Sequence, residues 1–391
     1  MESSASYCTR PVRVGPLRVR LWSDQPAVIA RFDRLFSGFE DAESGASADG
    51  REVELTVTGE FESTVDGAQL RAFGELGDHE LDITRLLNDR KLDAEPELLH
   101  LHAGAVALDG LAVVLAAMSG SGKTTLAAAL VQRGWGYVTD EQVALRPGDS
   151  ALFAYPRPLT VRRVVWPLFA DVAEVPSQQP DDLDDARVEV SPAAFGAVHG
   201  GPSRPIAVVV PRFDAGAVTE LTRFASAAEV VEHLASCCYD LERLGLPGME
   251  LLVSIAANCP AWHLRYAGLD EAAQCVSELY SAATTCEPYQ VRHIAPTSDK
   301  SPLGDGMVRR GRTAHAWAFA DGSTVVYDPP TRTITRLDAA GTALWDALHD
   351  AHAAEEVVES LRGDSDAAEY GIRSWLHTML VAGLLVEQDD G

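Results

Sequence analysis

Apolar and charged positions along the first quarter of the chain predict a region rich in β-strands. Residues 12–22 alternate apolar with basic side chains, which is the period of a strand with one buried face. Residues 38–50 are rich in glycine, serine and acids and predict a loop. Further predicted elements are strands over 53–57 and 60–65 and helices over 26–36 and 81–92. We therefore expect residues 1–97 to form an N-terminal β-rich portion.

Continuous apolar runs and helical spacing in the middle of the chain predict buried strands covered by helices. Residues 111–117 form one such run, and residues 126–133 follow it with the spacing of a helix. Other predicted strands cover 143–145, 152–163, 206–211 and 262–266, predicted helices cover 225–244 and 271–283, and an acidic loop covers 176–186. This order predicts an α/β domain over residues 98–286.

A loss of apolar periodicity and several prolines predict a linker over residues 287–305. Beyond the linker we expect a small α+β domain over residues 306–391. Its predicted strands cover 315–320, 324–327 and 333–337, and its predicted helices cover 339–349, 353–361 and 366–382. Strands followed by three helices indicate a winged-helix-like fold.

Between the central apolar run and its helix lies a turn of small residues, Ser119, Gly120, Ser121, Gly122, Lys123, Thr124 and Thr125. Buried strand, small-residue turn and helix are the layout of a phosphate-binding loop. Glycines let backbone N–H groups approach phosphate oxygens, and the helix N-terminus adds partial positive charge. We expect these seven residues to bind ATP, with Lys123 at the β- and γ-phosphates and Thr124 as a ligand of Mg²⁺.

The position of the lysine makes the loop more specific. The chain has only three lysines, Lys91, Lys123 and Lys300, so a lysine directly after the loop glycine is poorly explained by chance. The first glycine of the usual pattern falls on Ala117, so the turn must accommodate a Cβ there. A plain Gly/Ser turn is the alternative, and it is disfavoured because glycine, lysine, hydroxyl and flanking periodicity all agree.

Two segments flank the loop, residues 99–108 upstream and residues 133–141 downstream. With Lys123 they resemble the catalytic domain of the HPr kinase/phosphatase family, and more closely its relatives in peptide-modification gene clusters. The resemblance implies a P-loop core with a mixed sheet. It also implies that Asp140 is the base toward a substrate hydroxyl and that Glu141 binds Mg²⁺ with Thr124. His102 takes the family's histidine position and is expected to tune Asp140 through a hydrogen bond, with a core histidine as the alternative.

Three arginines downstream of the acidic pair, Arg157, Arg162 and Arg163, are candidates for approaching a phosphate. Surface arginines on an irregular strand are an equally good interpretation of the same residues.

The start of the first C-terminal helix, residues 337–345, and the order of elements around it resemble PqqD-like domains. These are chaperones that bind leader peptides of ribosomally made, modified peptides. The resemblance covers residues 306–387 and implies that an extended leader adds to the edge strand 333–337 beside helix 366–382. Candidate groove residues are Trp375, Leu376, Met379 and Leu380, with a core role the better interpretation for at least two of them. A small dimerisation domain is the alternative.

Charge and cysteine usage exclude some classes of partner. The chain has 391 residues and a formal net charge of −26, which argues against a nucleic-acid backbone or an anionic membrane surface as partner. No stretch is apolar for long enough to span a membrane, and no signal-peptide layout is found. Six cysteines without C-x-x-C pairs predict reduced thiols, so we expect a cytoplasmic protein.

Together these patterns predict an ATP- and Mg²⁺-dependent kinase for a Ser or Thr hydroxyl of a precursor peptide, whose leader the C-terminal domain holds. A small-molecule kinase and a catalytically silent, nucleotide-gated peptide chaperone are the alternatives. A homo-oligomer is plausible from the family resemblance.

Overall fold

The computed structural model describes residues 7–39, 51–57, 63–65, 68–69, 76–176, 187–296, 303, 306–349, 352–362 and 366–387. It confirms an α/β fold with several sheets and divides into two compact units. The first unit comprises Met1–Thr222, Cys237–Tyr239 and Trp262–Thr284, and the second comprises Arg223–Ser236, Asp240–Ala261 and Thr285–Gly391. Most of the loop predicted over 38–50, most of the loop predicted over 176–186 and the start of the strand predicted over 60–65 lie outside the described residues.

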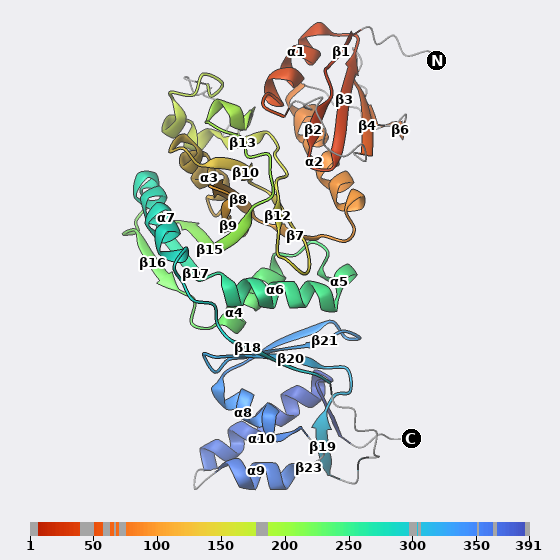
Figure 1. Ribbon diagram of the computed structural model, residues 1–391, viewed down its shortest axis with the longest axis vertical. Helices are drawn as coiled ribbons and strands as arrows, with labels where there is room; N and C mark the ends of the chain where they lie inside the picture. The colour runs from red at the N-terminus through yellow and green to blue at the C-terminus, as the bar shows by residue number, and fades with distance from the viewer. Residues whose placement is uncertain are drawn as a thin grey trace. The chain divides into compact units, whose positions relative to one another are not determined.

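The first unit begins with a mixed sheet in the order β1-β3-β4-β5-β6, with β2 paired to β3 (Figure 1). A turn at Gly15, with φ of 60°, divides the predicted strand 12–22 into β2 (Val12–Val14) and β3 (Leu17–Ser23). Alternate β3 residues are buried, as the sequence pattern predicts. The other elements are β1 (Tyr7–Cys8), α1 (Pro26–Leu35), β4 (Arg51–Val57), β5 (Ser63–Val65), β6 (Ala68–Gln69) and α2 (Leu76–Ala94).

A second mixed sheet, in the order β10-β8-β9-β15-β17-β16, forms the core of this unit. Strand β8 pairs antiparallel with both β9 and β10, so β9 and β10 run in the same direction and end at one edge of the sheet. Strand β15 pairs parallel with β9. The strands are β8 (Gly104–Leu108), β9 (Leu111–Leu115), β10 (Gly136–Thr139), β15 (Arg204–Phe213), β16 (Glu220–Arg223) and β17 (Ala261–Tyr266).

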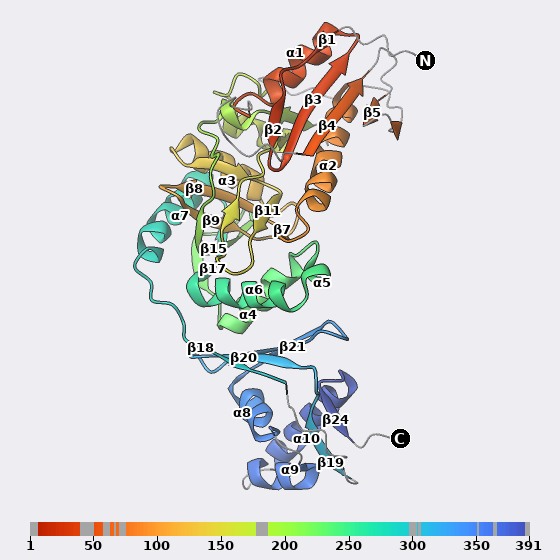
Figure 2. The same cartoon turned by 45° about the vertical axis from the view of Figure 1, so that its right-hand side comes forward.

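Two helices and two smaller sheets complete the core. Helix α3 (Lys123–Gln132) buries seven of its ten residues, and α7 (Leu269–Ala283) shares its apolar cluster (Figure 2). One small sheet has the order β12-β11-β7, and the other pairs β13 with β14. Their bounds are β7 (Leu99–His102), β11 (Gln142–Leu145), β12 (Leu152–Phe153), β13 (Leu159–Arg162) and β14 (Arg187–Val190), and the short helices are η1 (Arg163–Phe169) and η2 (Pro192–Ala194).

The second unit is built on a four-stranded antiparallel sheet in the order β18-β20-β21-β22. Helix α4 contacts β21 and β22, while α8, α9 and α10 share an apolar cluster with the same sheet. The unit's elements are α4 (Ala227–Ser236), α5 (Leu241–Leu244), α6 (Leu246–Asn258), β18 (Val291–Ile294), β19 (Met307–Arg310), β20 (His315–Phe319), β21 (Thr324–Asp328), β22 (Thr333–Leu337), α8 (Ala339–Ala347), β23 (His352–Ala353), α9 (Ala354–Arg362), α10 (Asp366–Val381) and β24 (Leu385–Glu387).

Two elements of the second unit differ from the sequence prediction. The interval 287–305, predicted as a linker, contains β18, which pairs with β20 along four residues. The single helix predicted over 225–244 is two helices, α4 and α5, and α6 follows where no helix was predicted. Helix α6 was missed because it is buried on most sides, so its apolar residues do not form a single stripe. The predicted four-part division of the chain stays a prediction.

The described residues include no helix that is both long and apolar enough to cross a bilayer.

Candidate functional site

The small-residue turn between β9 and α3 contains two glycines with left-handed backbone conformations. Gly122 precedes the helix with φ of 100°, and a Cβ there would also collide with the Tyr266 hydroxyl, so only glycine fits. Gly120 has φ of 83°. Ala117 is not among the described residues with positive φ, which explains why a Cβ is accommodated at the pattern's first glycine position.

Lys123 is the first residue of α3 and is 5% exposed. Its Nζ donates to the Ala117 carbonyl at 2.5 Å and lies 3.1 Å from Nε2 of His102. Burial lowers the pKa of Lys123, and the nearby carboxylates of Glu141 and Asp140 oppose that effect. The ammonium is therefore held at the inner side of the loop by one carbonyl and one imidazole.

His102 connects Lys123 to the second acid of the pair. Because the Lys123 ammonium has only hydrogens to offer, Nε2 must accept and Nδ1 must carry the proton. Nδ1 lies 2.7 Å from the Tyr239 hydroxyl and 3.3 Å from Oε1 of Glu141. Strand pairing explains this placement, since Gln142 of β11 lies opposite His102 of β7 and brings Glu141 alongside. The hydrogen bond predicted from His102 to Asp140 is thus made to Glu141 instead.

Asp140 lies at the end of β10, at the sheet edge where β9 leads into the loop. Its Oδ2 accepts a hydrogen bond from the Thr124 hydroxyl at 2.8 Å, and its Oδ1 accepts one from the Tyr137 hydroxyl at 2.9 Å. Arg157 Nε lies 3.6 Å from Oδ1. Asp140 is 2% exposed, so these donors replace the water that its carboxylate gives up.

Arg157 supplies the positive charge that the acidic pair needs. It is 9% exposed and also lies 3.7 Å from Oε2 of Glu141. Burial by itself would lower the pKa of Arg157, but Asp140 and Glu189 raise it well above its usual value. Burial would likewise raise the pKa of Glu141, yet the His102 hydrogen bond and the charge of Arg157 bring it below its usual value. The Glu141 side chain is therefore held as a carboxylate by its partners in the fold.

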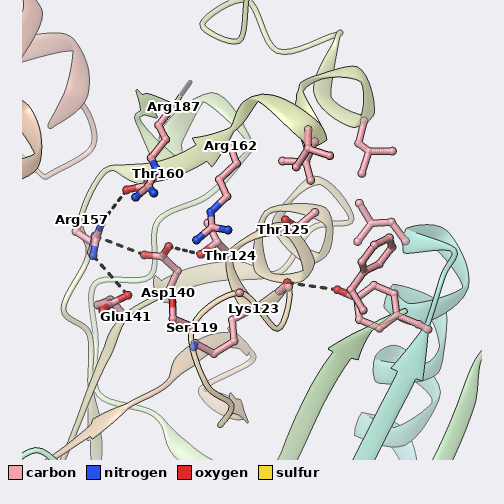
Figure 3. A pocket seen from close by; sticks show the side chains of 18 of the residues that line it. Ser119, Lys123, Thr124, Thr125, Asp140, Glu141, Arg157, Thr160, Arg162 and Arg187 are labelled. Carbon is pink, nitrogen blue, oxygen red and sulfur yellow. Dashed lines mark hydrogen bonds and ion pairs between the residues drawn. The ribbon is translucent and has the colours of Figure 1, made fainter. Parts of the chain in front are cut away.

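These residues face a cavity of about 590 Å³ in the first unit. Figure 3 shows Thr124, Thr125, Asp140 and the arginine side chains arranged around its polar half. Among the described residues, six charged side chains line it: Lys123, Arg157, Arg162 and Arg187 are positive, and Asp140 and Glu141 are negative. These described lining residues thus carry an excess of two positive charges, in a chain whose formal net charge is −26.

The other half of the cavity is apolar and unusually exposed. Val164 and Leu168 of η1 are 79% and 53% exposed, and Phe213 at the end of β15 is 54% exposed. The backbone N–H of Phe213 donates to the Ser121 carbonyl at 3.0 Å, so Phe213 is attached to the small-residue turn between β9 and α3, hereafter the phosphate-type loop. Tyr266 stands next to it, with the two ring centres 5.8 Å apart. The cavity therefore joins a cationic, hydroxyl-rich end to an apolar one.

The chemistry of the donor set suits a magnesium ion. The Thr124 hydroxyl, Asp140 and Glu141 are hard oxygen ligands and all three line the cavity. The described residues contain no cluster of three or more His, Cys, Asp or Glu side chains with metal-binding geometry. Mg²⁺ in phosphoryl-transfer sites is usually held by one or two side chains together with substrate phosphates, which is compatible with this arrangement.

Most of the predicted site residues meet in this cavity. Lys123, Thr124, Thr125, Asp140, Glu141, Ser119, Gly120 and Gly122 line it. His102 and Ser121 do not: His102 lies behind Lys123, and the Ser121 carbonyl is used by Phe213. Sequence reasoning missed the apolar wall, Thr84 and Asn88 of α2, Thr160 and Arg187. Of the three arginines named as candidates, Arg157 and Arg162 line the cavity and Arg163 does not. Nothing local marks Arg187, which strand pairing brings in from 25 residues beyond Arg162.

Lys91, on α2, is a second lysine drawn into the neighbourhood of the site. It is 0% exposed, its Nζ lies 5.1 Å from the centre of the Tyr155 ring, and it has no hydrogen-bond partner among the described residues. Burial, with the repulsion of Arg157, lowers the pKa of Lys91 to about 7, although Asp140 and Glu141 act in the opposite direction. A buried cation of this kind costs stability.

Comparison with solved structures finds several similar chains, one of which is an HPr kinase/phosphatase. The chain is similar to the Hpr(Ser) kinase/phosphatase from Coxiella burnetii, with 12% sequence identity and a TM-score of 0.24, over 47% of this chain and 95% of that one. So low a TM-score carries no inference about function. No family model and no curated protein match the sequence.

We expect Lys91→Met to raise the Tm by a few degrees at pH 6 and by less at pH 9. Between a folded pKa of about 7 and the ordinary value of 10.5, the unfolded chain binds a proton that the folded chain does not. The wild-type protein therefore regains stability from this group as the pH rises through that window, and the advantage of methionine shrinks. Thermal unfolding at the two pH values, with the exposed Arg51→Met as control, measures the difference. An equal gain at both pH values would contradict the burial of a titrating cation.

Proposed function

We propose that the chain is an ATP-dependent phosphotransferase that acts on a Ser or Thr hydroxyl of a precursor peptide. One observation carries the proposal: the Thr124 hydroxyl of the phosphate-type loop is hydrogen-bonded to Asp140 inside a single cavity. The loop proposed to bind the triphosphate therefore lies next to a carboxylate that can accept a hydroxyl proton. Phosphoryl transfer needs positioning and charge neutralisation, and these residues provide both.

Lys123, the loop N–H groups and the N-terminus of α3 would bind the phosphates of ATP. A triphosphate in the cavity would offer the Lys123 ammonium stronger acceptors than the Ala117 carbonyl and His102. The Nδ1–H of His102, in turn, is held by Tyr239 and Glu141, so His102 would keep its acceptor nitrogen toward the lysine. His102 is thus proposed as a positioning residue for Lys123.

The two acids differ in ways that suit two roles. Asp140 is 2% exposed, and two hydrogen-bond donors and the nearby Arg157 cation fix its orientation, which suits the group that orients the acceptor hydroxyl and takes its proton. The Glu141 side chain is 33% exposed, which suits a ligand of a hydrated ion. Thr124 and Glu141 would hold Mg²⁺, which, when bound, neutralises charge on the phosphates.

The apolar end of the cavity is proposed to receive the nucleobase. Phe213 and Leu168 are half exposed in the protein itself, and a planar base between them would bury apolar surface that is otherwise hydrated. Because Phe213 is hydrogen-bonded to the loop, the base-binding wall and the phosphate-binding turn are held at a fixed separation.

The second unit supplies features expected of a leader-binding domain. Strand β22 lies at one end of its sheet, so it is an edge strand within the described residues. Leu376 and Met379 of α10 are core residues, each 5% exposed. Trp375 and Leu380 are half-buried, and the Trp375 ring lies against Gly341 at the start of α8, beside Leu337 of β22. We propose that a leader adds along β22 and places an apolar side chain beside Trp375.

We expect Asp140→Asn to lower phosphoryl transfer by about 100-fold or more while ATP still binds, because the amide cannot accept a proton. Glu141→Gln should instead raise the Mg²⁺ concentration needed for half-maximal rate. The measurement is transfer of labelled phosphate from ATP to candidate peptides, resolved by mass spectrometry, with Lys123→Ala as the control that removes the loop cation. Transfer to small hydroxyl compounds alone would favour a small-molecule kinase, and nucleotide binding without any transfer would favour a silent chaperone.

Phe213→Ala should weaken binding of ATP by roughly tenfold, the scale of a lost aromatic contact. The same substitution should leave binding of inorganic tripolyphosphate unchanged, because that ligand has no base. Calorimetry with both ligands, at constant Mg²⁺, measures the two affinities. Equal weakening of both ligands would place the base elsewhere and assign Phe213 to the support of the loop.

The intact protein should phosphorylate a full-length precursor with a much lower KM than the same peptide without its leader, at similar kcat. The leader takes no part in the chemical step, so its binding should contribute equally to the ground and transition states. Deleting residues 306–391 is not a suitable test, because α4 packs against β21 and β22 in the same unit and would lose that cover. Identical KM values for the two peptides would leave the domain without a recognition role.

A further inference from the structure

Strands β13 and β14 present two arginines directly opposite each other on the wall of the cavity. Their antiparallel register pairs Arg162 with Arg187 and Thr160 with Glu189. The alternate residues Leu159, Val161 and Val190 are buried in the core cluster, so the face with Thr160 and the two arginines is the one turned to the cavity. Figure 3 shows the Arg162 guanidinium directed toward Thr124 and Asp140.

Placing Arg162 opposite Arg187 is expected to destabilise the β13–β14 strand pair. Like charges directly opposite on antiparallel strands destabilise the pair by a few tenths of a kcal/mol to about 1 kcal/mol. The neighbouring pair is complementary, since Thr160 donates to Glu189 at 2.5 Å, whereas Arg162 meets another cation. No hydrogen bond or ion pair of the Arg162 side chain is found within the described part of the chain. Within the described residues, the charge of Arg162 is thus not compensated by an ion pair or a hydrogen bond.

Arg157, another arginine of the cavity wall, differs from Arg162 because it has ion-pair partners. Arg157 lies within ion-pair distance of both acids and offsets part of their negative charge. Lys123 is likewise engaged by the Ala117 carbonyl and His102. Arg162 is therefore the lining cation for which the described residues provide no such partner, and its guanidinium lies toward Thr124 and Asp140 (Figure 3).

Resting on the proposed function, we propose that Arg162, reinforced by Arg187 across the strand pair, contacts the phosphoryl group during its transfer. In that step the bond from the γ-phosphorus to the bridging oxygen breaks and its electron pair stays on ADP. A new bond forms from the acceptor hydroxyl oxygen, and the hydroxyl proton goes to Asp140. Charge accumulates on the equatorial and leaving oxygens, and a preplaced guanidinium stabilises it. The cation would therefore be supplied by this chain itself.

The proposal is tested by binding of ADP alone and of ADP with aluminium fluoride and Mg²⁺, which imitates the phosphoryl group in transfer. Wild-type protein should bind ADP much more tightly when fluoroaluminate is present. Arg162→Gln should retain its affinity for ADP and lose most of that enhancement, and its single-turnover ATP hydrolysis should fall by about 100-fold or more. Arg187→Gln should show the same pattern to a smaller extent. Arg163→Gln, next in sequence but outside the cavity lining, should resemble wild type.

The Tm of the Arg162→Gln variant and three possible outcomes of the binding measurements test the proposal. Because the substitution removes one of two opposed like charges, Arg162→Gln should have a Tm equal to or above that of wild type. The proposal is overturned if Arg162→Gln keeps the full fluoroaluminate enhancement while Lys123→Ala loses it, and the proposed kinase function then still stands. It is also overturned if Arg162→Gln weakens ADP alone by the same factor, which would make the arginine a ground-state contact. If wild-type protein fails to bind ADP, the proposed function falls and this inference with it.

Discussion

The hydrogen bond between Thr124 and Asp140 is the contact on which the rest of the site depends. It joins Thr124, which follows Lys123 of the loop, to Asp140, which follows β10. The sheet brings these two residues together. Strand β8 makes this possible because it pairs antiparallel with β9 on one side and β10 on the other. The two flanking strands consequently end at the same edge, where one leads into the loop and the other into the acidic pair.

The buried charges around that contact are interdependent. Asp140 gives up almost all of its hydration and is stabilised by Tyr137, Thr124 and Arg157, and the cation of Arg157 is itself tolerated because of Asp140 and Glu189. Removing one member would leave another buried charge without its partner, and such losses usually exceed the net value of the pair. Conservative amide substitutions therefore give a cleaner measure of chemical roles at this site than truncations to alanine.

Features of the site that depend on neighbouring residues in the sequence could be predicted. Features that depend on contacts between distant residues could not. The loop from Ser119 to Thr125 could be predicted because strand, turn and helix signals are contiguous, and Gly122 shows why glycine is obligatory there. Arg187 and Phe213 reach the cavity through strand pairing and through a backbone hydrogen bond to Ser121, neither of which leaves a pattern in a single sequence. Strand β18 was missed for a related reason: half of its four residues are polar, and its partner β20 lies 21 residues beyond its end, so no local alternation marks it.

Several energetic costs coincide at one cavity, and their coincidence is more informative than any one of them. Val164 and Phe213 expose apolar surface, and Arg162 and Arg187 place like charges opposite each other. Lys91, which does not line the cavity, is buried near its acidic pair, and its Nζ has no hydrogen-bond partner among the described residues. A fold selected for stability alone would remove such features, since each can be relieved by a single substitution. They remain together where an apolar surface, an excess of cations and a phosphate-type loop meet. A ligand with an apolar ring at one end and a multiply charged anion at the other would offset the exposed surface and the opposed cations at once, so the distribution of strain, independently of any motif, favours a nucleotide site.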